Sequence, residues 1–185
     1  MEHLGTKELV TERLILRRLT LNDVDHVFNN WTNDNEVTKY LEWPTHINTD
    51  VTKQVLESWI EKYPQKEFYQ WAIVLREINE PIGTISVVNR KDTTKMVEIG
   101  YCIGKKWWNK GITSEALTAV IKFFFEQVSI NRIQAFHDTK NAFSGKVMEK
   151  CGMILEGKLR ESGKNNSGIC DHNLYGIIAK DYKKN

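Results

Sequence analysis

The amino-acid sequence predicts a mixed α/β (α+β) fold, with one sheet and helices packed on it. Two observations lead to this prediction. Three segments with alternating apolar residues follow one another through connections too short for a parallel crossover, so they should form an antiparallel meander. After them, the hydrophobic spacing changes to that of an amphipathic helix and then returns to that of strands. The 185 residues, 41% of them hydrophobic, suit one globular domain over residues 1–185.

The first third of the chain is expected to contain one strand and two helices. Partial alternation over residues 9–19 indicates a strand, which is followed by polar residues typical of a helix start. A short helix is expected over residues 24–31, and a longer one over residues 50–63, where apolar side chains recur at helical spacing. The segment between these two helices, residues 32–48, is expected to be irregular.

The rest of the chain alternates between strands and helices. The three strands of the meander are expected at residues 68–76, 81–89 and 96–103. The clearest amphipathic helix follows, because apolar residues from Leu117 to Val128 recur at i, i+3, i+4 and i+7. The remaining elements are a strand at 132–137, a helix at 141–151 that starts at Asn141 and stops at Gly152, and strands at 153–159 and 169–178.

Composition excludes several classes of function. The net charge is +2, from 26 basic and 24 acidic residues, which argues against nucleic-acid binding by bulk electrostatics. The three cysteines have no tight spacing and the five histidines form no HxxxH pair, so neither a disulfide framework nor a metal site is expected. No window approaches the roughly 20 apolar residues of a membrane span, and the N-terminus is too charged for a signal peptide. We therefore expect the reducing cytoplasm as the location and no membrane partner.

The segment from Val97 to Leu117 joins a strand to the amphipathic helix through a loop that contains Lys110 and Gly111. The N-terminus of a helix has unpaired N–H groups and a partial positive charge, which suit a phosphate. Gly111 allows a close approach to the backbone, and Lys110 adds a positive charge. These residues predict a pyrophosphate site, although a capped turn with a solvated lysine fits them equally well. Neither GxxxxGK[ST] nor GxGxxG follows a strand, so nucleotide hydrolysis and dinucleotide binding are disfavoured.

Four spaced motifs resemble those of the GCN5-related N-acetyltransferases (GNAT), in the RimJ/RimL-type branch. Trp108–Ala116 resembles the coenzyme A-binding motif W-G-K-G-[YI]-A-[TS]-E-A, and Asn141–Met153 resembles N-x-x-S-x-x-[VL]-[ML]-E-K-x-G-[FM]. Thr11–Arg17 is similar to the family's first strand, and Glu156–Arg160 to a later motif. The resemblance implies the GNAT fold, with one mixed, mostly antiparallel central sheet that is splayed between strands 4 and 5 and flanked by helices.

The resemblance also implies the reaction and the residues that bind the co-substrate. An acetyl group would pass from acetyl-CoA to a primary amine by direct attack, with both substrates bound together and no metal. The implied acetyl-CoA-binding residues are Cys102, Ile103, Gly104, Lys110, Gly111, Ile112, Thr113, Ser114, Asn141 and Lys146. Two positions depart from the family pattern, Asn109 in place of glycine and Thr113 in place of glycine or alanine, and they leave the loop geometry and the affinity open.

Glu98 is the leading candidate for a general base, because an ammonium with a pKa near 10.4 must lose a proton before it attacks. An outward-facing carboxylate on a strand is an equally good interpretation of Glu98, and Glu161 and Asp171 are rival bases. Ser144 is expected to stabilise the departing thiolate by a hydrogen bond, with a surface serine as the alternative. Both catalytic assignments, Glu98 and Ser144, come from the resemblance.

The acceptor groove is implied to lie between residues 29–44 and 161–171. These segments do not choose between a protein N-terminus, such as that of a ribosomal protein, and a small amine such as a polyamine, an amino acid or an antibiotic; the protein amine is slightly favoured. A sensor that binds acetyl-CoA without turnover, and a scaffold with a relic pocket, are the alternatives from other classes. No nucleic-acid partner is expected, and a homodimer is left open.

Overall fold

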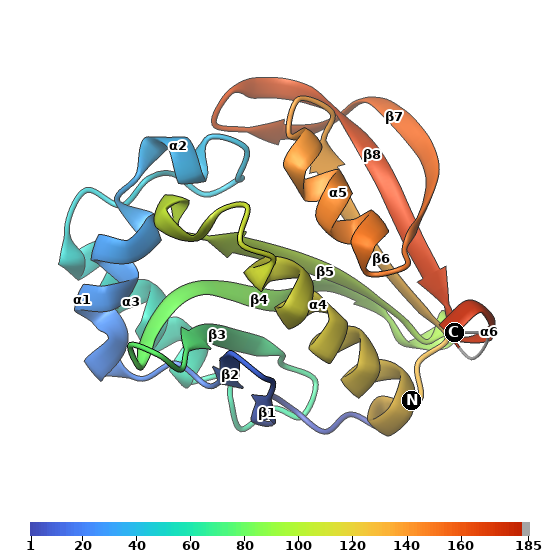
Figure 1. Cartoon of the computed structure of the whole chain (residues 1–185), viewed down its shortest axis with the longest axis horizontal. Helices are drawn as coiled ribbons and strands as arrows, with labels where there is room; N and C mark the ends of the chain where they lie inside the picture. Colours follow the sequence, from blue (N-terminus) through green and yellow to red (C-terminus); the bar gives the residue numbers. More distant parts are fainter. Residues whose placement is uncertain (183–185) are drawn as a thin grey trace.

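The computed structural model describes residues 1–182. Its centre is one eight-stranded sheet with the order β1-β2-β3-β4-β5-β6-β8-β7 (Figure 1). The strands are β1 (Leu9–Val10), β2 (Leu14–Arg17), β3 (Gln70–Leu75), β4 (Glu80–Lys91), β5 (Met96–Ile103), β6 (Arg132–Asp138), β7 (Ile154–Asn165) and β8 (Gly168–Ile178). The helices are α1 (Val24–Val27), α2 (Asn35–Thr38), α3 (Thr49–Ile60), α4 (Ile112–Phe123), α5 (Ala142–Lys150) and α6 (Ala179–Tyr182). No helix among these residues is long and apolar enough to cross a membrane.

The expected meander is confirmed, since β3, β4 and β5 pair in antiparallel fashion and β5 has the predicted bounds. The single strand expected over residues 9–19 is instead two short strands, β1 and β2. They are separated because the Thr11 side chain accepts a hydrogen bond from the Leu14 amide at 3.0 Å and turns the chain there. The last two strands are longer than expected, because β7 and β8 continue into a hairpin that ends at Asn165 and Gly168.

The sheet is split between β5 and β6, which are the fourth and fifth strands if β1 and β2 are counted as one. These two strands run parallel and pair only from Met96 to Glu98 on β5 and from Arg132 to Gln134 on β6. Beyond Glu98, β5 continues to Ile103 without pairing to β6. This divergence confirms the splay that the resemblance implies, and it leaves one edge of β5 open inside the sheet.

Each face of the sheet has its own apolar layer. On one face, α4 packs against Trp71 of β3, and the ring of Phe123 lies 5.8 Å from that of Trp71. On the other face, Ala72 and Val74 of the same strand pack against Trp31 and the α3 residue Leu56. Alternate residues of one strand thus support opposite layers, so α4 lies on one face while α1 and α3 lie on the other (Figure 1).

Candidate active site

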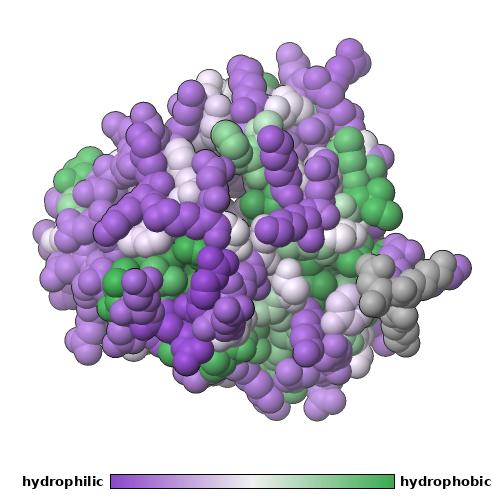
Figure 2. All heavy atoms as spheres, viewed as in Figure 1, coloured by the Kyte–Doolittle hydropathy of each residue, from purple (hydrophilic) through white to green (hydrophobic). Residues whose placement is uncertain are grey.

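A cavity of about 640 Å³ lies beside the unpaired end of β5, within the range of about 300–1,000 Å³ that is typical of small-molecule sites. Its wall comes from β5, the start of α4, the start of α5 and the α2 region. Figure 2 shows hydrophilic side chains gathered around a hollow in the upper half of this face. Ten predicted site residues line the cavity: Cys102, Ile103, Lys110, Gly111, Ile112, Thr113, Ser114, Asn141, Ser144 and Lys146. The structure therefore brings together nearly all of the residues that the sequence singled out.

The loop before α4 has the backbone that a phosphate site needs. Gly111 is left-handed (φ 73°) and Asn109 is left-handed as well (φ 60°). Because asparagine adopts this conformation more readily than most residues, Asn109 keeps a glycine-like backbone at this departure from the family motif. The first hydrogen bond of α4 runs from the Glu115 amide to the Gly111 carbonyl at 3.1 Å. The earlier amides of the helix lie at its N-terminus, where backbone N–H groups have no partner within the helix.

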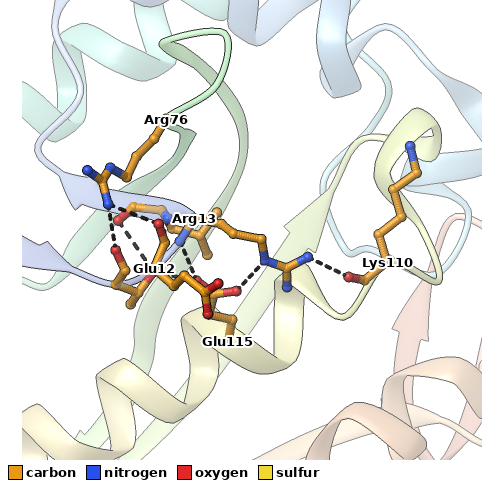
Figure 3. Close-up of polar contacts among 7 residues, drawn as sticks. Glu12, Arg13, Arg76, Lys110 and Glu115 are labelled. Carbon is orange, nitrogen blue, oxygen red and sulfur yellow. Dashed lines mark hydrogen bonds and ion pairs between the residues drawn. The ribbon is translucent and has the colours of Figure 1, made fainter.

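A network of polar contacts holds this loop and the start of α4 against the turn between β1 and β2 (Figure 3). The Glu115 carboxylate accepts hydrogen bonds from the Thr11 hydroxyl at 2.6 Å, from the Arg13 amide at 2.9 Å and from Arg13 Nε at 2.7 Å. Arg13 also donates to the Lys110 carbonyl at 3.0 Å. Burial by itself raises the pKa of Glu115, but the hydrogen bonds from Thr11 and Arg13 outweigh burial and hold that pKa below its usual value. The carboxylate is thus kept charged.

Sequence reasoning missed this network. Thr11 and Arg13 lie in one recognised motif and Glu115 in another, more than 100 residues away. The presence of a carboxylate in the first turn of α4 was visible in the sequence, but its partners were not. The network fixes where α4 begins, and therefore where its free N–H groups point.

The open edge of β5 presents backbone groups to the split. The Gly104 amide donates to the Ile82 carbonyl of β4 at 2.8 Å. Because successive amides of a strand point to opposite sides, the Cys102 amide is directed toward β4 as well, and the groups of Tyr101 and Ile103 face the split. Gly104 lies outside the lining of the cavity, and its lack of a side chain is required by packing, because an added Cβ would lie 2.1 Å from the Asn30 carbonyl oxygen.

Ser144 and Asn141 reach the cavity from α5. The Ser144 hydroxyl donates to the Tyr101 hydroxyl at 3.0 Å, and Tyr101 donates to the Ser144 carbonyl at 2.9 Å. Burial raises the pKa of Tyr101, so its phenol stays protonated. Asn141 occupies the N-cap position of α5 as expected, but its side chain makes no capping bond among residues 1–182. The sequence did not predict a role for Tyr101, because the residues next to it in the strand do not indicate that its partner, Ser144, lies on a distant helix.

The charge of the cavity suits a polyanion. Among the described residues 1–182, five lysines and one acidic residue, Glu36, line it; the lysines are Lys39, Lys110, Lys140, Lys146 and Lys150. The positions of Lys140 and Lys150 were not predicted, although Lys150 lies one turn after Lys146 on the same exposed side of α5. An added Cβ at Gly111 would be 3.7 Å from Lys150 Nζ, so this cation sits beside the start of α4. The helix N-terminus and these lysines together form a donor set that fits the phosphates of coenzyme A.

The candidate bases Glu98, Glu161 and Asp171 do not line the cavity. Glu98 is half-buried at the point where β5 and β6 diverge, and its carboxylate accepts a hydrogen bond from Gln134 Nε2 at 3.0 Å. Its side chain is on the face opposite α4, the same face as Cys102, roughly 13 Å away along the strand at about 3.3 Å per residue. Asp171 pairs with Lys158 at 2.8 Å and accepts a bond from the Glu161 amide. The hydrogen bond from Lys158 lowers the pKa of Asp171, which makes that carboxylate a weaker base.

The thiols beside the cavity are not activated. Burial raises the pKa of Cys102 and also that of Cys151, so both stay protonated near neutral pH. A thiol, unlike a thiolate, is a poor nucleophile. The described part of the chain, residues 1–182, contains no group of three His, Cys, Asp or Glu side chains arranged to hold a metal ion.

Known proteins are similar to this chain in sequence and in fold. Residues 13–154 match the acetyltransferase (GNAT) domain family. The chain is 32% identical over 170 residues to the uncharacterised N-acetyltransferase YoaA of Bacillus subtilis, which covers 92% of this chain and 96% of that relative. It is 28% identical over 139 residues to the ribosomal-protein-serine acetyltransferase of Escherichia coli, with 75% of this chain and 76% of the relative covered.

A solved structure agrees as well. A GNAT-family acetyltransferase from Bacillus anthracis superposes with a TM-score of 0.82 at 26% identity, and covers 94% of this chain and 99% of the other. The residues that match the GNAT family, 13–154, include β5, the loop before α4, and α5, all of which line the cavity. The chain therefore belongs to the GNAT acetyltransferase family and is an N-acetyltransferase that uses acetyl-CoA as its co-substrate.

Proposed function

We propose that this protein acetylates a primary amine by direct attack of the amine in a ternary complex, and that the acceptor is a protein N-terminus of the ribosomal-protein kind. The observation that carries the proposal is that one cavity runs from Gly111 past Tyr101 and Ser144 to the α2 region. Both substrates can then meet in one cavity, without a covalent intermediate on the protein. The protonated thiols of Cys102 and Cys151 support direct attack.

Different residues of the cavity would bind different parts of acetyl-CoA. The first amides of α4, from Ile112 to Ser114, would donate to the pyrophosphate, with Lys110, Lys146 and Lys150 as neighbouring cations. The open edge of β5 at Tyr101 and Ile103 would pair with the amides of the pantetheine arm, and Asn141 would bond to it from α5. Preorganised backbone N–H groups of this kind are typically worth a few kcal/mol when they face an oxygen that gains charge.

Acetyl-CoA supplies a thioester whose carbonyl carbon accepts the amine. An N–H group of the open edge of β5 would stabilise the charge on that carbonyl oxygen. Before the reaction, Tyr101 holds the Ser144 side chain by accepting its hydrogen bond. The single hydroxyl proton of Ser144 would turn from Tyr101 to the departing sulfur as the thioester bond breaks. Glu98 would remove the proton of the amine through intervening water, because its carboxylate lies at the closed end of the split.

The choice of a protein acceptor rests on relatives. The ribosomal-protein-serine acetyltransferase of Escherichia coli aligns over three quarters of the chain, which favours an N-terminal amine. The three cysteines, Cys102, Cys151 and Cys170, are free, which supports the reducing cytoplasm as the place of the reaction.

The test is an acetyl-transfer screen read by release of free thiol. The panel contains peptides with free N-termini taken from ribosomal proteins, spermidine, free amino acids and an aminoglycoside. Turnover of the peptides at a kcat/KM at least tenfold above that of the small amines is the expected result. A preference for a small amine would show that this amine, and not a protein N-terminus, is the acceptor. Binding of acetyl-CoA without any thiol release would instead indicate a sensor.

A further inference from the structure

The helix α5, which carries Asn141 at its N-cap and Ser144 in its first turn, contacts both halves of the split sheet. Toward one half, the hydroxyls of Ser144 and Tyr101 join it to β5. Toward the other half, α5 packs on β6 and β8 (Figure 1), and the Tyr175 hydroxyl of β8 donates to the Glu149 carboxylate at 2.8 Å. The distance of α5 from β6 therefore affects where Ser144 lies in relation to β5.

The His137 side chain of β6 fills the space beneath α5 at Gly145, the residue after Ser144. An added Cβ at Gly145 would lie 2.8 Å from His137 Nε2, 3.2 Å from His137 Cε1 and 3.2 Å from the Tyr175 hydroxyl oxygen. The shortest of these distances is well below the roughly 3.5–4.0 Å of ordinary packing contacts. The absence of a side chain at Gly145 thus allows α5 to lie this close to β6.

The ring of His137 is held firmly in this place. The residue is only 7% exposed, and its ring packs against the buried ring of Tyr175 with 5.6 Å between the centroids. His137 Nδ1 lies 2.8 Å from the Asp138 carbonyl oxygen. Because a carbonyl oxygen can only accept, Nδ1 carries the proton of that bond, and Nε2 of the neutral ring is an acceptor.

This second nitrogen shows what the ring contributes. His137 Nε2 is buried and has no hydrogen-bond partner among residues 1–182. A buried polar atom without a partner lowers the stability of the fold. The contribution of the ring therefore lies in the space that it fills between α5 and β8, and not in a bond from Nε2.

We propose that His137 is a positioning residue for acetyl transfer, which acts as a fixed spacer against Gly145 and thereby sets the place of the Ser144 hydroxyl. Ser144 directly precedes Gly145, so a shift of α5 at Gly145 moves Ser144 away from its contact with Tyr101. A displacement of about 1 Å at a reacting group can cost about 100-fold in rate. This inference deepens the proposed function and rests on the role proposed there for Ser144.

The first test compares Gly145→Ala with the matched control Gly176→Ala, using the amine of the panel that the wild type acetylates fastest. In Gly145→Ala the new methyl group meets the fixed ring of His137, so kcat should fall about tenfold while the KM for the amine stays within about twofold. In Gly176→Ala the methyl group meets the side-chain ends of Glu156 and Arg132, which are partly exposed and can move into solvent. The control should keep the wild-type kcat, and circular dichroism checks that both variants are folded.

Two double variants test whether the effect passes through the ring and through Ser144. Adding His137→Ala to Gly145→Ala gives the methyl group room, so kcat should recover to within about threefold of the wild type. Adding Ser144→Ala to Gly145→Ala should give a protein no slower than Ser144→Ala alone, because the two changes remove the same interaction. An unchanged kcat in Gly145→Ala, no recovery with His137→Ala, or losses that multiply with Ser144→Ala would each overturn the positioning role.

The single variant Ser144→Ala separates this inference from the proposed function. A slow Ser144→Ala beside a Gly145→Ala protein of normal kcat would overturn the role of His137 alone. A wild-type kcat in Ser144→Ala would instead overturn the role proposed for Ser144, and the positioning role with it.

Discussion

The two ends of the cavity are held in place by different kinds of contact. At the co-substrate end, a helix N-terminus is fixed by the charged carboxylate of Glu115, which accepts hydrogen bonds from Thr11 and Arg13 in the turn between β1 and β2. At the acceptor end, an irregular loop is fixed by neutral bonds from Asn166 to backbone carbonyls. Sites built on helices and strands are more rigid than sites built on loops. We infer from this difference that the acetyl-CoA end is suited to one constant ligand. The acceptor that the other end binds can change when a few loop contacts are altered.

The largest effect is expected from filling the co-substrate end directly. Gly111→Trp should weaken acetyl-CoA binding by about 100-fold or more, because Gly111 is left-handed and a bulky side chain there also enters the cavity. Calorimetry gives the Kd, and circular dichroism shows whether the fold is kept. Gly157→Trp is the control, since an added Cβ at Gly157 meets nothing within 4 Å. Unchanged affinity in a folded Gly111→Trp protein would remove the pyrophosphate site from α4.

Glu115→Gln breaks the anchor of the co-substrate end without filling it. The free energy of unfolding should fall by about 2 kcal/mol, a usual value for hydrogen bonds to a charged group, and acetyl-CoA should bind about fivefold more weakly. The matched control is Glu57→Gln, which breaks the exposed pair with Lys53 and should cost at most about 1 kcal/mol. Equal losses in the two variants would show that the anchor has no special role.

The same anchor predicts a dependence of stability on pH. The pKa of Glu115 is lower in the folded protein than its usual value of about 4.3, so the stability that it contributes is complete above that usual value. This stability is lost as the pH falls through the folded pKa. Thermal unfolding should therefore show a difference in Tm between wild type and Glu115→Gln that is largest near neutral pH and shrinks below about pH 4. A difference that stays constant down to pH 3 would contradict the charged anchor.

Tyr101→Phe tests the middle of the cavity, where the two ends meet. Removing the hydroxyl that holds Ser144 should lower kcat about tenfold and leave the Kd for acetyl-CoA within about twofold. Tyr182→Phe, which loses a bond to Glu126 far from the cavity, is the control and should turn over normally. Because both hydroxyls act as one unit, Ser144→Ala with Tyr101→Phe should be no slower than Ser144→Ala alone. Fully additive losses in kcat would show that the two hydroxyls act independently.

The smallest effect is expected at Glu98, whose side chain lies on the face of the sheet opposite α4. Glu98→Gln should lower kcat/KM about threefold near pH 6.5 and hardly at all near pH 9, where more of the amine has already lost its proton. Glu161→Gln, on the rival carboxylate, should follow the wild-type profile at both values. A pH–rate profile of Glu98→Gln identical to that of the wild type would exclude Glu98 as the base.

Most of the fold and most of the co-substrate end followed from local patterns. The spacing of apolar residues located β5 and α4, and the strand–loop–helix order placed Gly111 at a helix N-terminus. The prediction of one strand over residues 9–19 was wrong, because a single side-chain bond from Thr11 breaks the alternation. Gly104 was expected at the cofactor but lies outside the cavity lining, since its amide bonds to Ile82 and Asn30 packs against it.

By itself, the sequence determined the order of the elements, the family and the loop that carries Lys110 and Gly111, because periodicity and motif spacing are properties of neighbouring residues. Only the tertiary structure decided the pairing of Arg13 with Glu115, the hydroxyl pair of Tyr101 with Ser144, and the hydrogen bond from Asn166 to the Thr38 carbonyl. Each of these contacts joins residues more than 40 positions apart. Their geometry depends on how the split sheet and its helices pack, which no local pattern records.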